Sequence, residues 1–393
     1  MTGSSVPAPS ERRGPGPTSL GQRALAPDLA RGFMLLFIAL VNAQFFLTAP
    51  DIVASVPDQL VVLVQSTVVN ARAIPLFSLL FGYGMVQLLR RLDAGGGRPL
   101  GVLRRRGVWL VVIGLVHGAL LLPVDIIGAY GLAVLLFAGL LRAGDATLLW
   151  VSGAFAAASI GLRTAVVMLR AASGDDASVA AGSLVRGDIA AATAERLQEW
   201  VLYTPVTLLT VVVPPLLWGV WAARRRILDD PARHRRFLVW AATAGLGTAV
   251  LGGFPDALIQ AELWTDAPLQ AVNVLAVVHD VTGWAGGVGW AALIGLVAIR
   301  AAERRGAVVR AVEAVGQRSM TCYLLQSVVF TAAFAPYGAG LGASQGAAVA
   351  AAIGAATWAA TVAVAETMRR RGHRGPAETL VRRLTYGRRS PAG

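Results

Sequence analysis

The chain has 393 residues, of which 55% are hydrophobic and only 15% are charged. Soluble globular domains carry about 25% charged residues, so this composition excludes an ordinary soluble enzyme and a disordered protein. A membrane-spanning helix needs about 20 apolar residues, and the hydrophobic residues here suffice for about ten. The net charge is +13, and every basic residue except histidine is arginine. Because the arginines stand in short tracts between apolar runs, they indicate topology and contact with anionic lipid, and nucleic acid is not an expected partner.

Ten apolar runs predict an all-α polytopic membrane protein with about ten transmembrane helices. Residues 1–24 are polar and rich in Pro, Gly and Ser, so we expect a disordered cytoplasmic tail rather than a secretory signal. Residues 25–368 form the predicted transmembrane domain, and residues 369–393 form a basic cytoplasmic tail. The predicted spans are Leu29–Leu47, Ala73–Leu89, Gly107–Leu122, Val124–Leu141, Thr147–Leu169, Trp200–Ala223, Phe237–Phe254, Val272–Ile299, Ser319–Ala335 and Gly346–Thr367.

The charged residues predict the orientation of these spans. Arginine tracts precede the first span, follow the last one, and separate spans two and three, four and five, six and seven, and eight and nine. With an even number of spans, all these segments lie on one side, which the positive-inside rule makes cytoplasmic, together with both termini. The opposite loops carry the acids Asp51, Asp58, Asp175, Asp176, Asp188, Asp256, Glu262 and Asp266.

Three connecting segments have a character of their own. The amphipathic stretch Gln59–Ala71 is expected to lie on the outer surface before the second span. The outer loop 170–198 is Ala-rich and predicts partial helix. The inner segment 303–318 spaces valines at helical intervals among arginines, which is typical of a helix along the lipid headgroups.

Ionisable residues within spans are costly and therefore mark candidate functional sites. Asp28 and Arg31 stand three residues apart, so they share a helix face at the inner membrane edge. They form either a substrate-binding pair or a topological arginine paired with an aspartate that favours the helix dipole. Asn42 lies eleven residues later, near the outer edge of the same span.

A second candidate pair is His117 and Asp125. The short Leu-Leu-Pro turn between spans three and four is expected to bring both to the outer surface. A carboxylate beside an imidazole can tune a general base; alternatively, His117 only bonds a backbone carbonyl at a polar corner.

A third candidate pair, His279 and Asp280, lies within an apolar run of about 28 residues that several glycines interrupt. This run is too long for one straight span, so we expect a kink or break near the pair, where backbone groups line a cavity. The alternative is a surface helix that ends at His279 before the span. Arg72, at the outer entrance to span two, is expected to supply a cation to the same vestibule.

Other familiar chemistries have no motif in this sequence. It has no phosphate-binding loop, no dinucleotide-binding glycine pattern, no HExxH and no nucleophile elbow. The single cysteine, Cys322, excludes an internal disulfide, and four histidines do not predict a metal site. No bound cofactor is expected.

Four stretches in order resemble the YeiB-like family of uncharacterised bacterial membrane proteins (domain of unknown function 418). They are Asp28-Leu-Ala-Arg-Gly-Phe33 with Val41-Asn42; Phe77-Ser-Leu-Leu-Phe-Gly-Tyr-Gly84; Gly114-Leu-Val-His-Gly118 with Asp125-Ile-Ile-Gly-Ala-Tyr-Gly131; and Gly316-Gln-Arg-Ser-Met-Thr-Cys-Tyr-Leu-Leu-Gln-Ser327 with Gly375-Pro-Ala-Glu378 and Arg382-Arg-Leu-Thr-Tyr-Gly387. The resemblance spans residues 23–387 and implies a multi-pass protein of the bacterial cytoplasmic (inner) membrane.

This family is grouped with transmembrane acyltransferases, so the resemblance also implies a chemistry. The acyltransferase type 3 pattern has Arg-Gly and then a His; here Arg31 and Gly32 match, and Asn42 takes the place of the His. Asparagine cannot act as a base near pH 7, so acyl transfer would need His117 or His279.

The leading hypothesis is therefore an acyltransferase whose donor, acyl-CoA, enters from the cytoplasm past Arg31. The acceptor, a sugar, a lipid or a small metabolite, would approach from outside near His117 and Asp125. In this hypothesis His117, Asp125 and His279 are the catalytic candidates, and Asp28, Arg31, Asn42, Arg72 and Asp280 bind substrate. A transporter or exporter of a small or lipid-like molecule is the alternative, and a scaffold or sensor without catalysis is the third possibility.

Overall fold

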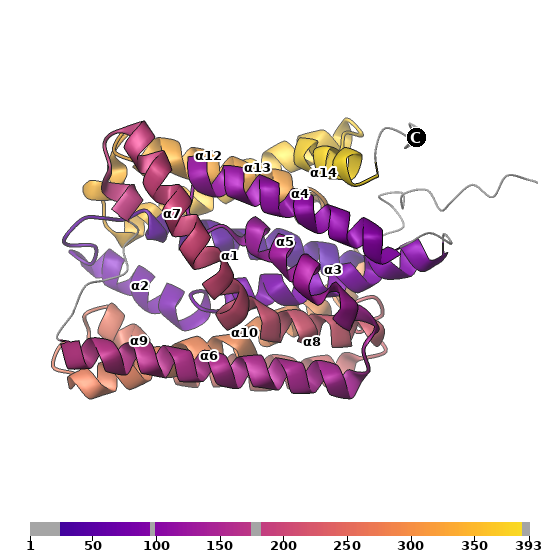
Figure 1. The fold of residues 1–393 in the computed structure, drawn as a ribbon, viewed down its shortest axis with the longest axis horizontal. Coiled ribbons are helices and arrows are strands. Elements are labelled where there is room, and N and C mark those ends of the chain that lie inside the picture. The colour runs from indigo at the N-terminus through magenta and orange to yellow at the C-terminus, as the bar shows by residue number, and fades with distance from the viewer. Residues whose placement is uncertain (1–23, 95–98, 174–181, 387–393) are drawn as a thin grey trace, which may run out of the picture.

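The computed structural model describes residues 24–94, 99–173 and 182–386, and within these ranges the regular elements are all helical, which confirms the predicted all-α class. Figure 1 shows the helices running roughly along the long axis of the molecule, with α4, α12, α13 and α14 on one side and α6 and α9 on the other. Their bounds are α1 Leu25–Phe45, α2 Val56–Val68, α3 Ala73–Ala94, α4 Pro99–Leu120, α5 Ile126–Phe137, α6 Asp145–Ser173, α7 Ile189–Thr207, α8 Val213–Arg224, α9 Arg235–Gln260, α10 Leu269–Glu303, α11 Ala307–Gln317, α12 Ser319–Phe334, α13 Ala347–Arg370 and α14 Pro376–Tyr386.

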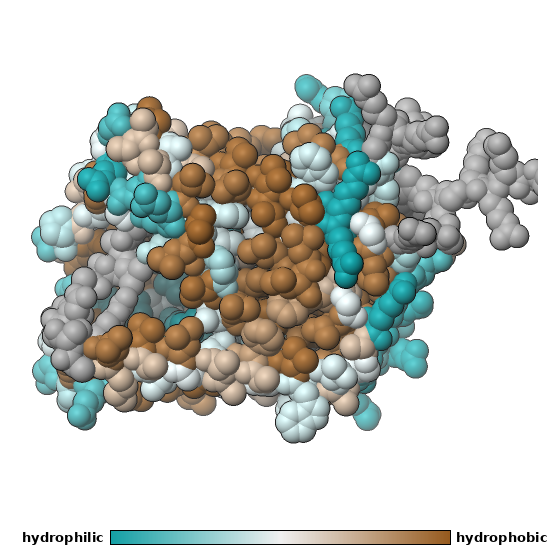
Figure 2. All heavy atoms as spheres, viewed as in Figure 1, coloured by the Kyte–Doolittle hydropathy of each residue, from teal (hydrophilic) through white to brown (hydrophobic). Residues whose placement is uncertain are grey.

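The helices carry the length and apolarity of a multi-pass membrane protein. Seven helical stretches of the described chain are long and apolar enough to cross a membrane, and two shorter apolar helices, Ile126–Arg142 and Ser319–Phe334, accompany them. Together with α4, these helices overlap each of the ten predicted apolar runs, with ends that differ by a few residues. In Figure 2 a broad hydrophobic band lies between hydrophilic ends, which is the surface expected of a protein surrounded by lipid.

Three basic connections meet at one end of the bundle. Arg90 of α3 donates to the Arg224 carbonyl at 3.0 Å, and Gln87 donates to Asp229 at 2.7 Å. Arg224 in turn donates to Asp145, at the start of α6, at 2.8 Å. The α3–α4, α5–α6 and α8–α9 connections therefore share one side, in agreement with the predicted topology.

The predicted break near His279 and Asp280 is wrong, because α10 is one continuous helix of 35 residues. The break lies instead between α2 and α3, where Ala71 has a left-handed φ of 58°. A Cβ added at Gly283 of α10 would lie 2.2 Å from the Ala71 carbonyl oxygen. The glycines of α10 therefore allow close contact with a break in another helix rather than a break in their own.

The prediction that residues 59–71 lie on the outer surface is also wrong. Most of this stretch is α2, whose side chains Val62, Gln65 and Ser66 are buried, and Ser66 donates to Gln260 of α9 at 3.1 Å. Asp256, expected in an outer loop, lies in α9 and is 3% exposed. The more polar side of α2 packs into the bundle, whereas Val56, Leu60 and Val64 are exposed.

The predicted helices outside the spans are present. The loop 170–198 contains the start of α7, and the segment 303–318 contains α11, whose Gly316 touches the Asp28 carbonyl of α1. The basic tail contains α14, whose Glu378 accepts hydrogen bonds from the backbone amides of Met320 and Thr321 at the start of α12. The predicted disordered tail (all but residue 24), Asp175 and Asp176 lie outside the described residues.

Candidate functional site

The structure brings His117 and Asp125 together, and it adds a third group, Ser327. His117 lies three residues before the end of α4, Asp125 is the N-cap of α5, and Ser327 belongs to α12. His117 Nδ1 is 2.9 Å from Asp125 Oδ1, and His117 Nε2 is 2.9 Å from Ser327 Oγ. The imidazole therefore joins a carboxylate to a hydroxyl. We call these three residues the histidine–serine cluster.

The position of Asp125 follows from its role at the start of α5. Its carboxylate accepts hydrogen bonds from the backbone amides of Ile127 and Gly128, at 3.1 and 2.5 Å. Aspartate is a preferred N-cap because these amides have no partner within the helix. A Cβ on Gly114 of α4 would lie 2.3 Å from Asp125 Oδ2. The cap and this glycine together hold the carboxylate beside His117.

The expectation that this pair lies at the outer surface is wrong, since all three residues are buried, with exposed fractions of 3%, 2% and 0%. The turn after α4 is covered by α7. Arg196 of α7 is buried, donates to the Leu120 carbonyl at 3.0 Å, and also donates to the Tyr337 hydroxyl. Trp200 of α7 packs against Gly118 and Gly128. The histidine–serine cluster is thus separated from water by protein.

Several polar atoms around this cluster have no well-aligned hydrogen bond within the described part of the chain. They include His117 Nδ1 itself, the Asn42 amide nitrogen, the Tyr323 hydroxyl and the Trp200 indole nitrogen. The Tyr323 ring centroid lies 5.0 Å from that of His117, and its hydroxyl lies beside the Asn42 side chain. Buried polar atoms are nearly always paired in proteins, so these imperfectly aligned groups mark the surroundings of the histidine–serine cluster as the more polar part of this buried region.

A second buried cluster surrounds Arg72, which is fully buried rather than at an entrance. Its Nη1 donates to the Asn70 carbonyl and its Nη2 to the Ala249 carbonyl, both at 2.6 Å. The Asn70 carbonyl lies in the break between α2 and α3, and a Cβ on Gly253 of α9 would lie 2.0 Å from Arg72 Nη2. The guanidinium therefore holds the broken helix against α9.

Asp256 and His279 complete this arginine cluster. Gln260 donates to Asp256 Oδ2 at 2.5 Å, and His279 Nδ1 lies 3.4 Å from the same oxygen. His279 Nε2 is 2.9 Å from the Ser66 carbonyl oxygen. Because a carbonyl oxygen only accepts, Nε2 must carry a hydrogen. His279 Nδ1 and Asp256 then face each other across a position that one proton can occupy.

The remaining candidates, Asp280, Asp28 and Arg31, make their main contacts outside the two histidine clusters. Asp280 forms an ion pair with Arg163 of α6, and its other oxygen is 3.9 Å from His279 Nδ1. Arg31 and Asp28 form the ion pair that their spacing predicts, at 2.8 Å. Eleven residues of helix, about 16 Å, separate Arg31 from Asn42. The structure therefore places Asn42 near the histidine–serine cluster, Arg72 in the arginine cluster, and Arg31 at the opposite end of α1.

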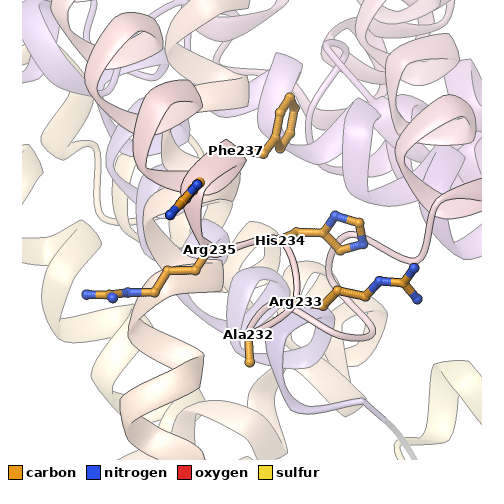
Figure 3. Close-up of a pocket in the computed structure, with 6 residues that line it drawn as sticks. Ala232, Arg233, His234, Arg235 and Phe237 are labelled. Atoms are coloured by element: carbon orange, nitrogen blue, oxygen red, sulfur yellow. The ribbon is translucent and has the colours of Figure 1, made fainter.

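A surface hollow of about 490 Å³ lies over residues 232–237, between α8 and α9. Its lining comes from one continuous segment, and Figure 3 shows Arg233 and Arg235 pointing in opposite directions. The charged groups do not converge on a common point, so this hollow does not form a binding site of the kind that the two buried clusters suggest.

Four residues of these sites were missed by the sequence analysis: Ser327, Tyr323, Asp256 and Arg163. Ser327 and Tyr323 appeared only within the stretch Gly316–Ser327 that carries the family resemblance. Nothing else in the sequence marks them, because Ser and Tyr are common in buried apolar helices. Arg163 stands alone in the fifth predicted span and could have been singled out by the cost of a charge there. Asp256 was assigned to a loop because the predicted seventh span ends at Phe254, whereas α9 continues to Gln260.

Comparison with known proteins gives two matches. Residues 222–388 match the model of DUF418, described as a protein of unknown function. The uncharacterized protein YxaH of Bacillus subtilis (strain 168) is 26% identical over 412 residues, which cover 94% of this chain and 96% of YxaH. No solved structure matches the chain. The predicted resemblance to this family is confirmed for residues 222–388, and the chain is a distant homologue of YxaH.

Proposed function

We propose that this chain, whose residues 222–388 match the DUF418 model, is an acyltransferase of the bacterial cytoplasmic membrane. It moves an acyl group from a cytoplasmic donor to a hydroxyl or amine acceptor, on a sugar, a lipid or a small metabolite, that arrives from the outer side. The observation that carries the proposal is the placement of His117, with Asp125 at one ring nitrogen and a hydroxyl at the other. This is the arrangement that acyl transfer requires of a general base.

The buried carboxylate gives His117 its direction. Asp125 Oδ1 lies 2.9 Å from His117 Nδ1, although the contact is not aligned as a hydrogen bond. In the tautomer that carries its hydrogen on Nδ1, this carboxylate leaves the lone pair of Nε2 free to accept a proton from a hydroxyl. As the proton arrives, the positive charge on the imidazole is stabilised by the carboxylate. Burial strengthens this attraction, because the surrounding medium screens it less than water does.

Donor binding is assigned to the other end of α1. The planar guanidinium of Arg31 suits phosphate groups such as those of acyl-CoA, and Asp28 orients it at 2.8 Å. Arg31→Lys keeps the charge and loses the two-pronged geometry. We expect this variant to raise the KM for acyl-CoA while folded protein is still obtained; an unchanged KM would remove Arg31 from the donor site.

The experiment is transfer from radiolabelled acyl-CoA to a bacterial lipid and sugar extract by the purified protein in vesicles. His117→Gln should lower transfer by about 100-fold or more, with a normal elution profile in detergent. His373→Gln, at an exposed position outside the spans, is the matched control. Equal activity of both variants would remove His117 as the base, and an inactive wild-type protein would contradict the acyltransferase function.

Transport of a small or lipid-like molecule is the second candidate, favoured by a different observation. A helix break stands beside the buried arginine cluster, and broken helices with buried charges line substrate or ion paths in many transporters. The position between His279 and Asp256 suits a coupling proton. Vesicles with an imposed pH gradient would then take up or release substrate, and Asp256→Asn would abolish that flux while leaving acyl transfer unchanged.

A further inference from the structure

We propose that Ser327 is a nucleophile that carries the acyl group as a serine ester between donor and acceptor. This inference rests on the proposed acyltransferase function and adds a covalent step to it. Ser327 Oγ is 2.9 Å from His117 Nε2 and 3.3 Å from its alternative partner, the Tyr323 carbonyl oxygen. The shorter contact is the one through which the hydroxyl can lose its proton.

The three side chains form a continuous chain of polar contacts. Asp125 lies against His117 Nδ1, and Ser327 lies against Nε2, each at 2.9 Å. They come from three different helices, α5, α4 and α12, so no local sequence motif indicates that these three residues lie together. A serine activated by an adjacent imidazole that a third group orients is the general pattern of an activated nucleophile.

Donors for the developing negative charge stand beside the serine. Tyr323 precedes Ser327 by four residues, so the two share one face of α12. The Tyr323 hydroxyl lies against the Asn42 side chain and the Ile126 backbone, and neither this hydroxyl nor the Asn42 amide nitrogen makes a well-aligned hydrogen bond among the described residues. Both can donate to the oxygen of a tetrahedral intermediate. This gives Asn42 a task that does not require it to take a proton.

The reaction then has two balanced halves. Ser327 Oγ attacks the carbonyl carbon of an acyl thioester, the new O–C bond forms, the C–S bond breaks, and the serine proton passes through His117 to the thiolate that leaves. In the second half an acceptor hydroxyl attacks the serine ester, its proton goes to His117, and the same proton returns to Ser327 Oγ. No oxidant, reductant or metal is consumed.

The test uses the full-length protein in detergent with acetyl-CoA, and separately with a fluorophosphonate, which labels activated serines without any donor site. Peptide mass spectrometry should find the acetyl group and the phosphonate on Ser327. Both labels should vanish in Ser327→Ala and His117→Gln. They should persist in Ser344→Ala, a control at an exposed serine. Ser327→Cys should replace the ester by a thioester that neutral hydroxylamine cleaves.

The possible outcomes distinguish a failure of the Ser327 nucleophile from a failure of the proposed acyltransferase function. If Ser327→Ala transfers acyl groups at the wild-type rate while His117→Gln does not, Ser327 is no nucleophile and His117 activates the acceptor directly. If Ser327 takes both labels, the covalent step stands even where the chosen acceptor is wrong. If the wild-type protein takes neither label, the nucleophile is refuted; if it also transfers nothing, the acyltransferase function falls with it.

Discussion

The two buried clusters start from the same pair of groups, a histidine beside an aspartate, and differ in what meets the second ring nitrogen. In the histidine–serine cluster it meets the Ser327 hydroxyl, and in the arginine cluster it meets the Ser66 carbonyl. A hydroxyl can give up a proton and receive it back, whereas a carbonyl oxygen only accepts. Burial and a neighbouring carboxylate are thus shared by both histidines, and only His117 is placed to activate a nucleophile.

The clusters differ equally in how they use charge. Arg72 in the arginine cluster is tied to two backbone carbonyls and faces Asp256 as its counter-charge. Its groups connect the break between α2 and α3 to α9. In the histidine–serine cluster the side chains instead contact one another: Asp125 lies against His117, and His117 lies against Ser327. The main role of the arginine cluster is therefore to hold helices together, and the proton position between His279 and Asp256 is secondary.

The largest expected effect comes from removing that connection. Arg72→Met leaves the Asn70 and Ala249 carbonyls unsatisfied and the Asp256 charge buried without compensation, so it should destabilise the protein by about 3–5 kcal/mol. Thermal unfolding and yield in detergent measure the loss. Arg310→Met, at an exposed arginine, is the control. Adding Asp256→Leu should recover part of the stability, since the unpaired charge is then absent; equal stability of the two single arginine variants would contradict the structural role.

Two substitutions at Asp125 separate its roles as a helix cap and as a partner of His117. The Ile127 and Gly128 amides donate to different oxygens of Asp125, so Asn keeps an oxygen for one of them and remains a preferred cap, whereas Ala loses the cap and about 1 kcal/mol of stability. Both remove the charge beside His117. We therefore expect Asp125→Asn to lose less stability than Asp125→Ala yet transfer acyl groups more slowly than wild type, by a smaller factor than His117→Gln. Wild-type transfer by Asp125→Asn would reduce the residue to a cap.

His279→Gln tests whether the second histidine is catalytic. A glutamine amide can still donate to the Ser66 carbonyl, so the stability loss should be about 1 kcal/mol or less, and acyl transfer should stay within about twofold of wild type. Proton-coupled flux in vesicles should fail, because the titratable group facing Asp256 is gone. If transfer is lost here and kept in His117→Gln, the base belongs to α10.

Apolar runs were enough to predict the all-α class and the place of the seven long apolar helical stretches, because each follows from the local cost of polar groups in lipid. The contact between His117 and Asp125 was also predictable, since a four-residue turn holds two adjacent helix ends together. Ser327 was not, because it reaches His117 from a helix more than 200 residues away along the chain. The break was assigned to α10 for its glycines, yet those glycines make room for a partner helix, which only the packing reveals.

The smallest effect is expected outside the spans, at Glu313 of α11, and it depends on pH. Burial raises the pKa of this carboxyl above its ordinary value, and the Asp28 charge adds to the rise, against the opposite pull of Arg305 and Arg369. A raised pKa in the folded state means that stability is lost as the pH rises through that pKa. Glu313→Gln should therefore melt slightly above wild type near neutral pH, and the gap should close as the pH falls below about 4, where the carboxyl is protonated in both states. Melting curves in detergent at several pH values, with exposed Glu303→Gln as the control, measure the difference; a wild type that melts above Glu313→Gln at neutral pH would mean that the arginines outweigh the burial.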